Sequence, residues 1–252
     1  MDYFYKVPID LTDYFENDYK QIMVRLCLER YSNIEGVCFT SISLICEKCG
    51  YSVDRHNKSF LAYVRKVLLS LVENNEITQI YGKGINSVSV TGLVGFYLEN
   101  KFYSLPTKMF AKLSYDVFDT IINIDYPLSK PTLLKVYIYI RGRIIENEQQ
   151  AYGFYGSVER VVKDLDLNRK TVDTCLDLFI DHNLFIKYTT GSCYINGDPK
   201  NVPNIYVLPD DQAENNIKAL LEELKQRYKV ETFASVLTPL KNVNDYNHQK
   251  CD

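Results

Sequence analysis

The sequence predicts an α+β protein, mainly helical, in which one set of helices followed by a small β-hairpin occurs twice. The pentapeptide FYKVP, which begins at Phe4, returns as FYSLP at Phe102, 98 positions later. A shift of 116 residues aligns segment 17–41 with segment 133–157, including Arg25 with Arg141. Farther along, the matching shift falls to 108, so the first copy carries eight extra residues. The order of the predicted elements, more than residue identity, indicates a duplication.

Length and composition fit two ordinary globular domains. The chain has 252 residues, of which 46% are hydrophobic and 24% are charged, enough apolar residues for a real core. No apolar run approaches the roughly 18 residues that span a bilayer, and the N-terminus does not resemble a secretory signal. We therefore expect a cytoplasmic protein without a membrane partner. The net charge of −3 argues against indiscriminate coating of nucleic acid, although a local basic surface remains compatible with it.

In the first copy, apolar residues at helical spacing predict a helix over 17–33, a short helix after Ser41 and a long helix over 59–77. Segment 76–92 then alternates on both sides of Gly82-Lys83-Gly84. That pattern predicts a β-hairpin with its turn at these glycines.

The second copy repeats this order. Ser129 and Pro131 predict the start of a helix over 129–144, and a short helix follows Ser157. Asn168 is the predicted cap of a long helix over 168–185, whose apolar stripe follows an i, i+3, i+4, i+7 pattern. Segment 184–209 predicts a hairpin around Thr190-Gly191 and a third short strand.

These elements predict a first domain over 1–98 and a second over 99–209. The second domain has an inserted helix at about 114–124, which packs the domains together or dimerises the chain. A capped amphipathic helix is expected over 210–230, docked on the second domain or binding a partner, and a flexible tail over 240–252.

A short helix, a turn, a second helix and a hairpin resemble the winged helix-turn-helix. The stretch SVERVVKDLDLNRKTVDTCLDLFIDHNLFIKY, from Ser157, carries this resemblance most clearly. Two such domains, each introduced by F-Y-x-x-P, are similar to the tandem winged-helix replication initiators of bacterial plasmids and phages. The resemblance covers about residues 4–208 in architecture and about 30 residues as a motif. It implies two tandem winged helix-turn-helix domains with β-hairpin wings, binding to origin repeats, and recruitment of a host helicase or helicase loader.

A recognition helix enters the major groove, where every base pair presents a distinct pattern of donors and acceptors. The resemblance therefore implies DNA contacts from exposed early positions of the second long helix and from the wing. In the second domain these residues are Arg169, Lys170, Thr171, Asp173, Thr174, Lys187 and Lys200. In the first domain they are Arg55, His56, Asn57, Lys58, Arg65, Lys66 and Lys83. A solvated helix face, or a protein-binding role for either domain, is the alternative interpretation.

Catalytic and metal-binding signatures are weak. Cys46 and Cys49 form one CxxC without the second ligand pair that a structural zinc site needs, and buried small side chains explain them better. The three histidines are far apart, and the segment around Gly82 lacks the spacing of a phosphate loop. We expect no enzyme activity, no cofactor and no metal.

The sequence thus favours a protein that binds duplex DNA sequence-specifically and initiates replication of a plasmid, phage or other mobile element. A winged-helix transcriptional regulator that binds operators as a homodimer remains an alternative. A protein-interaction adaptor that never touches DNA is the second alternative, and the sequence pI of 5.7 keeps it open.

Overall fold

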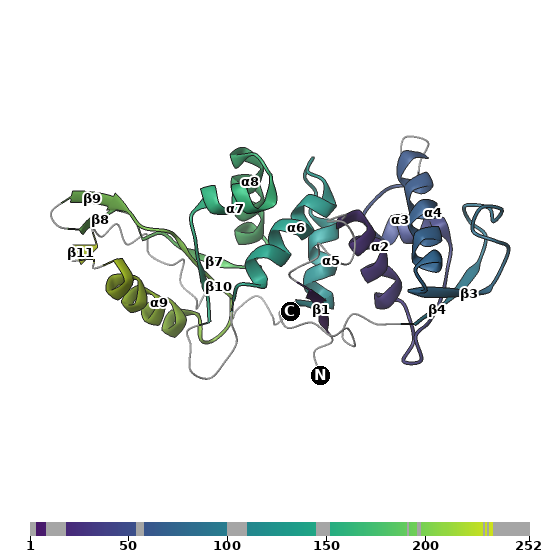
Figure 1. Ribbon diagram of the computed structural model, residues 1–252, viewed down its shortest axis with the longest axis horizontal. Coiled ribbons are helices and arrows are strands. Elements are labelled where there is room, and N and C mark those ends of the chain that lie inside the picture. Colours follow the sequence, from purple (N-terminus) through teal and green to yellow (C-terminus); the bar gives the residue numbers. More distant parts are fainter. Residues whose placement is uncertain are drawn as a thin grey trace, which may run out of the picture. The chain divides into compact units, whose positions relative to one another are not determined.

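The computed structural model describes residues 4–8, 19–53, 58–99, 110–144, 152–190, 192–195, 198–228, 230 and 232–233. For Lys58 and for the strands at 192–195, 198–201 and 232–233, it describes the backbone. The described residues form an α+β structure with eight helices, about half helical, and small antiparallel sheets (Figure 1). The chain divides into two compact units, Met1–Gly142 and Arg143–Asp252, here called unit 1 and unit 2. No helix among these residues is both long and apolar enough to cross a membrane.

The described residues of unit 1 form six helices or strands before position 90 and four after it. They are β1 (Phe4–Pro8), α2 (Tyr19–Arg30), β2 (Val37–Thr40), α3 (Ile42–Lys48), α4 (Lys58–Glu73), β3 (Ile77–Tyr81), β4 (Val94–Leu98), β5 (Phe110–Ser114), α5 (Tyr115–Asn123) and α6 (Lys130–Arg141). The three-stranded sheet has the order β2-β4-β3 and is antiparallel throughout. Its inner face buries Cys38, Val94 and Phe96.

The strand that opens the chain pairs with an unexpected partner. β1, the FYKVP pentapeptide, is antiparallel to β5, with Tyr5 opposite Leu113. The hydroxyl of Tyr5 donates to the carbonyl of Leu26 at 3.1 Å, which ties this pair to α2. The similar pentapeptide at 102–106 lies outside the described residues.

A buried arginine marks the first helix of unit 1. Arg25 is 1% exposed and lies 3.5 Å from the Glu29 carboxylate and 3.7 Å from that of Glu76. Burial lowers the pKa of Arg25, while the two carboxylates oppose that shift. Arg141 in α6, which the shift of 116 aligns with Arg25, is also buried. Both copies therefore have a buried arginine at this position of their first helix.

Unit 2 contains nine elements in the described residues. They are β6 (Phe154–Tyr155), α7 (Val158–Leu165), α8 (Arg169–Asp181), β7 (Ile186–Tyr188), β8 (Ser192–Ile195), β9 (Asp198–Asn201), β10 (Ile205–Val207), α9 (Ala213–Tyr228) and β11 (Thr232–Phe233). One sheet has the order β6-β10-β7 and another the order β11-β8-β9. The order helix, strand, helix, helix, strand, strand occurs from α2 to β4. It occurs again as α6, β6, α7, α8, β7 and β10 when β8 and β9, which belong to the other sheet, are left aside. The strand orders β2-β4-β3 and β6-β10-β7 are equivalent.

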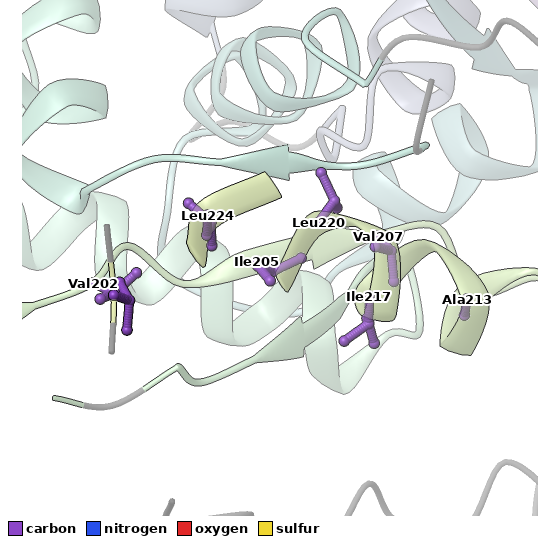
Figure 2. Close-up of a cluster of buried hydrophobic side chains, with 8 residues drawn as sticks. Val202, Ile205, Val207, Ala213, Ile217, Leu220 and Leu224 are labelled. Carbon is purple, nitrogen blue, oxygen red and sulfur yellow. The ribbon is translucent and has the colours of Figure 1, made fainter. Parts of the chain in front are cut away.

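The C-terminal helix covers one face of the β6-β10-β7 sheet. α9 contacts β10, and its residues Ile217, Leu220 and Leu224 pack with Ile205 and Val207 in a buried apolar cluster (Figure 2). The helix lies within the predicted 210–230 segment, and α5 lies within the predicted 114–124 segment. The tail at 240–252 lies outside the described residues.

Both predicted hairpins were wrong in their pairing. Residues 82–92 form turns, and β3 pairs with β4 at 94–98 instead of with residues 85–91. In unit 2, β7 pairs with β10, whereas β8 pairs with β9 and β11. Local alternation does not specify which segments of the chain pair with each other.

The two compact units also differ from the predicted boundary at 98 and 99. α6 was expected to belong to the second domain, but it packs against α2, β5 and α5 in unit 1. Ser129 precedes α6 without making a capping side-chain hydrogen bond. The repeat of element order and the division into compact units therefore do not coincide.

Candidate nucleic-acid interface

Two capped helices and a tight turn form the candidate interface of unit 2. Ser157 caps α7 through the Arg160 amide, and Asn168 caps α8 by accepting from the Thr171 amide at 2.8 Å. Between them Asp166 adopts a left-handed conformation with φ of 51°. Val172, Cys175, Leu176 and Phe179 bury the inner face of α8. The opposite face of its first two turns is therefore held toward solvent.

Arg169, the first residue of α8, is exposed but already engaged. Its guanidinium lies 2.5 Å from the Glu159 carboxylate on α7 and 3.6 Å from the Asp173 carboxylate one turn later. A hydrogen bond from its own backbone amide and the charge of Arg169 lower the pKa of Glu159. Because the side chains of Glu159 and Asp173 are 63% and 47% exposed, water and salt screen these pairs. Arg169 can exchange them for another anion at little cost.

The other predicted residues of α8 share its outer face. Lys170 is exposed, and no described residue forms a hydrogen bond or ion pair with it. Thr171 and Thr174 are half-buried, as is Asp173. The structure thus brings a free cation, a paired cation, two hydroxyls and one carboxylate together on two helical turns.

Lys187 lies on the edge strand β7. It is half-buried and opposite Tyr206, so it shares the sheet face of that residue. Burial raises the pKa of Tyr206, and the carboxylates of Asp173 and Asp177 on α8 add to that shift. Lys187 therefore lies on the sheet face nearer α8. Lys200 belongs to β9, and its side chain lies outside the described part of the structure.

In unit 1, Arg65 has a structural role that the sequence did not indicate. Its guanidinium donates to the backbone carbonyls of Ile85 and Val88, the latter at 2.7 Å. The side chains of Ile85 and Val88 are buried. Arg65 thus fastens the 82–92 segment to α4 and has fewer donors left for a ligand.

The remaining predicted residues of unit 1 are less concentrated. Lys66 on α4 and Lys83 after β3 are exposed, and no described residue pairs with either ammonium group. Lys58 begins α4, but its side chain is outside the described residues, as are Arg55, His56 and Asn57 altogether. The described surface of α4 thus offers one free cation.

Sequence reasoning missed the charges on α7. Arg160 pairs with Asp164 at 3.6 Å, and Arg143 pairs with the same carboxylate at 3.8 Å. Lys163 is exposed without a described partner. The available signal was the pair of cap residues, Ser157 and Asn168, which mark the first turns of α7 and α8, where Glu159 pairs with Arg169. The interface is consequently a mixture of cations and carboxylates.

The cysteines whose side chains the structure describes, Cys27, Cys38, Cys46, Cys49 and Cys175, are buried free thiols. Cys46 and Cys49 are 1% and 0% exposed, as expected for small core side chains. Burial raises the pKa of Cys38, Cys46 and Cys175 to about 12. Among the residues whose placement is described, no group of three metal-ligating side chains comes together.

A shallow hollow lies elsewhere in unit 1. It has a volume of about 370 Å³ and is lined by residues including Glu47, Tyr51, Asp125 and Lys130. The ammonium group of Lys130 donates to the Ile124 carbonyl, and burial lowers the pKa of Lys130. None of the sequence-predicted site residues lines this hollow.

Comparison with known proteins adds no assignment: no model of a protein family matches the chain, and no curated protein matches it significantly.

Proposed function

We propose that the chain is a non-enzymatic protein that binds duplex DNA sequence-specifically, through tandem winged helix-turn-helix domains. The observation that carries the proposal is the solvent-facing start of α8, where Arg169, Lys170 and Thr171 follow an Asn168 cap. Arginine, lysine and threonine are side chains that reach base edges or phosphates in the major groove. The first helix and the wing of such a motif position the second helix through phosphate contacts.

The element order supports this proposal. In each copy a strand is followed by two helices and then by the two other strands of its three-stranded sheet, the later of which lies in the centre; in the second copy β8 and β9 intervene between these two strands. In unit 2, β7 and β10 form the wing beside α8, and Lys187 is its described cation. Unit 1 contributes less, because Arg65 is bound to backbone carbonyls. We assign recognition of DNA bases to unit 2. We assign contacts with the DNA phosphates, through Lys66 and Lys83, to unit 1.

Initiation of replication of a plasmid, phage or other mobile element is the task that we propose. Its support is the resemblance of the chain to tandem winged-helix initiators, with a host helicase or helicase loader as the implied partner. A regulator of transcription would use the same α8 surface, but it would bind a two-fold symmetric operator as a homodimer.

The direct test replaces both Arg169 and Lys170 with alanine and measures binding to a selected duplex. Each lost base contact is expected to cost about 1–3 kcal/mol, and each lost phosphate contact reduces the salt slope by about one. Circular dichroism should show an unchanged fold, because both side chains are exposed.

A matched control removes the same two charges from α9, through Lys218→Ala and Lys225→Ala. Both residues are exposed or half-buried on the helix that covers the opposite sheet face, so affinity should stay within about twofold. Equal losses in the two double variants would mean that net charge, not α8, governs binding. Unchanged affinity of a folded α8 variant would remove the assignment.

A further inference from the structure

One face of the unit 1 sheet presents aromatic side chains to solvent. Phe39 on β2 and Tyr81 on β3 are each 55% exposed, and Tyr97 on β4 is 39% exposed. Phe39 and Tyr81 both lie opposite Gly95 of the central strand, and their rings meet edge to face with centroids 6.0 Å apart. A side chain at Gly95 would collide with both residues. Phe39 and Tyr81 thus form an aromatic row across the sheet, and Tyr97, two residues after Gly95 on β4, adds a third exposed ring on the same face.

The equivalent row in unit 2 is covered. The shift of 116 aligns Phe39 with Tyr155, and strand pairing then places Ile205 and Tyr188 where unit 1 has Gly95 and Tyr81. Ile205 is completely buried, and Tyr155 and Tyr188 pack against the same cluster. One face of the same small sheet is therefore buried in one copy and exposed in the other.

The cover in unit 2 is the amphipathic helix α9. Its buried residues Ile217, Leu220 and Leu224 follow an i, i+3, i+7 pattern over the sheet (Figure 2). At the edge, the Tyr155 hydroxyl donates to Glu223 at 2.7 Å, and the Arg227 guanidinium lies 5.5 Å from the centre of the Tyr155 ring. In unit 2, this sheet face thus binds a helix that has an apolar stripe and a cation, Arg227, at the edge of that stripe.

Charges around the open face indicate the polarity of its partner. Thr78, opposite Tyr97, donates to the Glu99 carboxylate at 2.6 Å, and the Leu98 amide donates to the Gly36 carbonyl beside exposed Glu35. The Glu99 carboxylate therefore lies near Tyr97 at the end of β4, and Glu35 precedes β2 at the same end of the sheet. They disfavour a phosphodiester strand and favour lysine or arginine on the partner.

We propose that this face of unit 1 docks an amphipathic α-helix of a partner protein. The helix carries leucine or isoleucine at i, i+3 and i+7 against Phe39, Tyr81 and Tyr97, and a basic residue near Glu35 and Glu99. The α9 helix of the chain does not fill this role, because its apolar stripe is buried in unit 2. The proposal does not depend on DNA recognition by α8, since it concerns a sheet face of unit 1.

The test uses a fluorescent synthetic peptide with the sequence of residues 210–230 as the helical probe. It supplies the required stripe together with Lys225 and Arg227. Fluorescence anisotropy with the full chain should show saturable binding. The double variant Phe39→Ser, Tyr81→Ser should weaken it about tenfold or more, as loss of central aromatic anchors does. A peptide with Leu220→Asp and Leu224→Asp should not bind.

Tyr126→Ser is the matched control, because Tyr126 is 44% exposed but belongs to no strand of this sheet. It should bind the peptide as the unchanged chain does. Circular dichroism melts must show that each variant is folded. If the double variant does not fold, the variant Phe39→Tyr, Tyr81→Phe replaces it. This variant should shift the affinity for the peptide, because it moves the hydroxyl group from one ring to the other while both aromatic rings are kept.

Three results would overturn the proposal. The first is the absence of saturable peptide binding, and the second is binding that is insensitive to the face variants, which would mean exchange with α9 in unit 2. The third is a different occupant. An oligothymidylate of about 20 nucleotides whose binding requires Phe39 and Tyr81 would indicate single-stranded nucleic acid. A dimer in sedimentation that these variants dissociate would indicate a second copy of the chain.

Discussion

Arg169 lies where two carboxylates pair with one guanidinium. Glu159 reaches it from α7 and Asp173 from the next turn of α8. Both pairs are exposed, and such pairs contribute little to folding. The pairs are expected to affect binding instead, because an anion that approaches α8 must displace Glu159 before it can pair with Arg169.

We therefore predict that Glu159→Gln strengthens binding to a selected duplex, by about 0.5–1 kcal/mol. The substitution keeps the shape of the side chain, removes one negative charge and releases Arg169. Fluorescence titration at a fixed salt concentration measures the gain. It should shrink when Arg169→Ala is already present, because the two residues are coupled.

Glu214→Gln on α9 is the control, since Glu214 is also exposed but lies on a different helix, far from α8 in sequence. A gain of the same size there would indicate a general charge effect. No gain from Glu159→Gln would mean that Arg169 does not contact the DNA.

Arg65 gives a second prediction at the residue scale, this time for stability. Arg65→Ala leaves the carbonyls of Ile85 and Val88 without their donor, and we expect a loss of about 1–3 kcal/mol in the free energy of unfolding. Arg65→Lys should recover only part of it, because a single ammonium group lacks the planar fork of donors. Urea titration followed by circular dichroism measures both changes.

The neighbouring exposed residue provides the comparison. Lys66→Ala should change the free energy of unfolding by less than about 0.5 kcal/mol. If Arg65→Ala is as harmless as Lys66→Ala, the guanidinium does not hold the 82–92 segment.

At the element scale, the chain just after α3 packs closely against α5. Gly50 follows the helix with φ of +76°, and an added Cβ atom would lie 2.3 Å from the Ile122 carbonyl oxygen. Gly50→Ala is therefore strained both in its backbone and by a clash. We expect a loss of about 1–3 kcal/mol in unfolding free energy.

Gly84→Ala is the corresponding control, because nothing lies within 4 Å of its added Cβ and its φ is not left-handed. Differential scanning calorimetry of both variants separates a local steric effect from the general cost of replacing glycine. Equal transition temperatures would contradict the packing of Gly50 on α5.

The helices were more predictable from sequence than the sheets. Asn168 and the stripe from Val172 to Phe179 specify α8 locally, and the structure has the cap and the buried face where the pattern indicated. Strand pairing depends on competition between distant segments. Ile85 and Val88 resemble alternating strand residues, yet they are buried in a turn that Arg65 holds.

In the candidate site, too, features set by one helix could be predicted, whereas contacts between distant segments could not. Exposure of Lys170 could be predicted from helical spacing, because it lies opposite the apolar stripe. The engagement of Arg169 by Glu159 could not, since it depends on how α7 meets α8 across the left-handed turn at Asp166. The backbone role of Arg65 was hidden for the same reason.

At the scale of the whole molecule, two similar sets of elements have become unequal. Both bury an arginine in the first helix and place the last strand in the centre of the sheet. Within the described residues, only the second covers its outer sheet face, with α9, and only the second presents both an exposed arginine and an exposed lysine at the start of its long helix. We infer a division of labour, with DNA recognition in unit 2 and an open protein-docking face in unit 1.

The measurement that tests the central claim most directly is selection of bound sequences from a random duplex pool, followed by titration of the selected duplex at two salt concentrations. We predict one enriched motif, bound at least about 10³-fold more tightly than bulk DNA and more weakly at the higher salt concentration. Iterated motifs would favour replication origins, and paired half-sites an operator. No enrichment, with affinity at the level of bulk DNA, would contradict recognition of DNA sequence by α8.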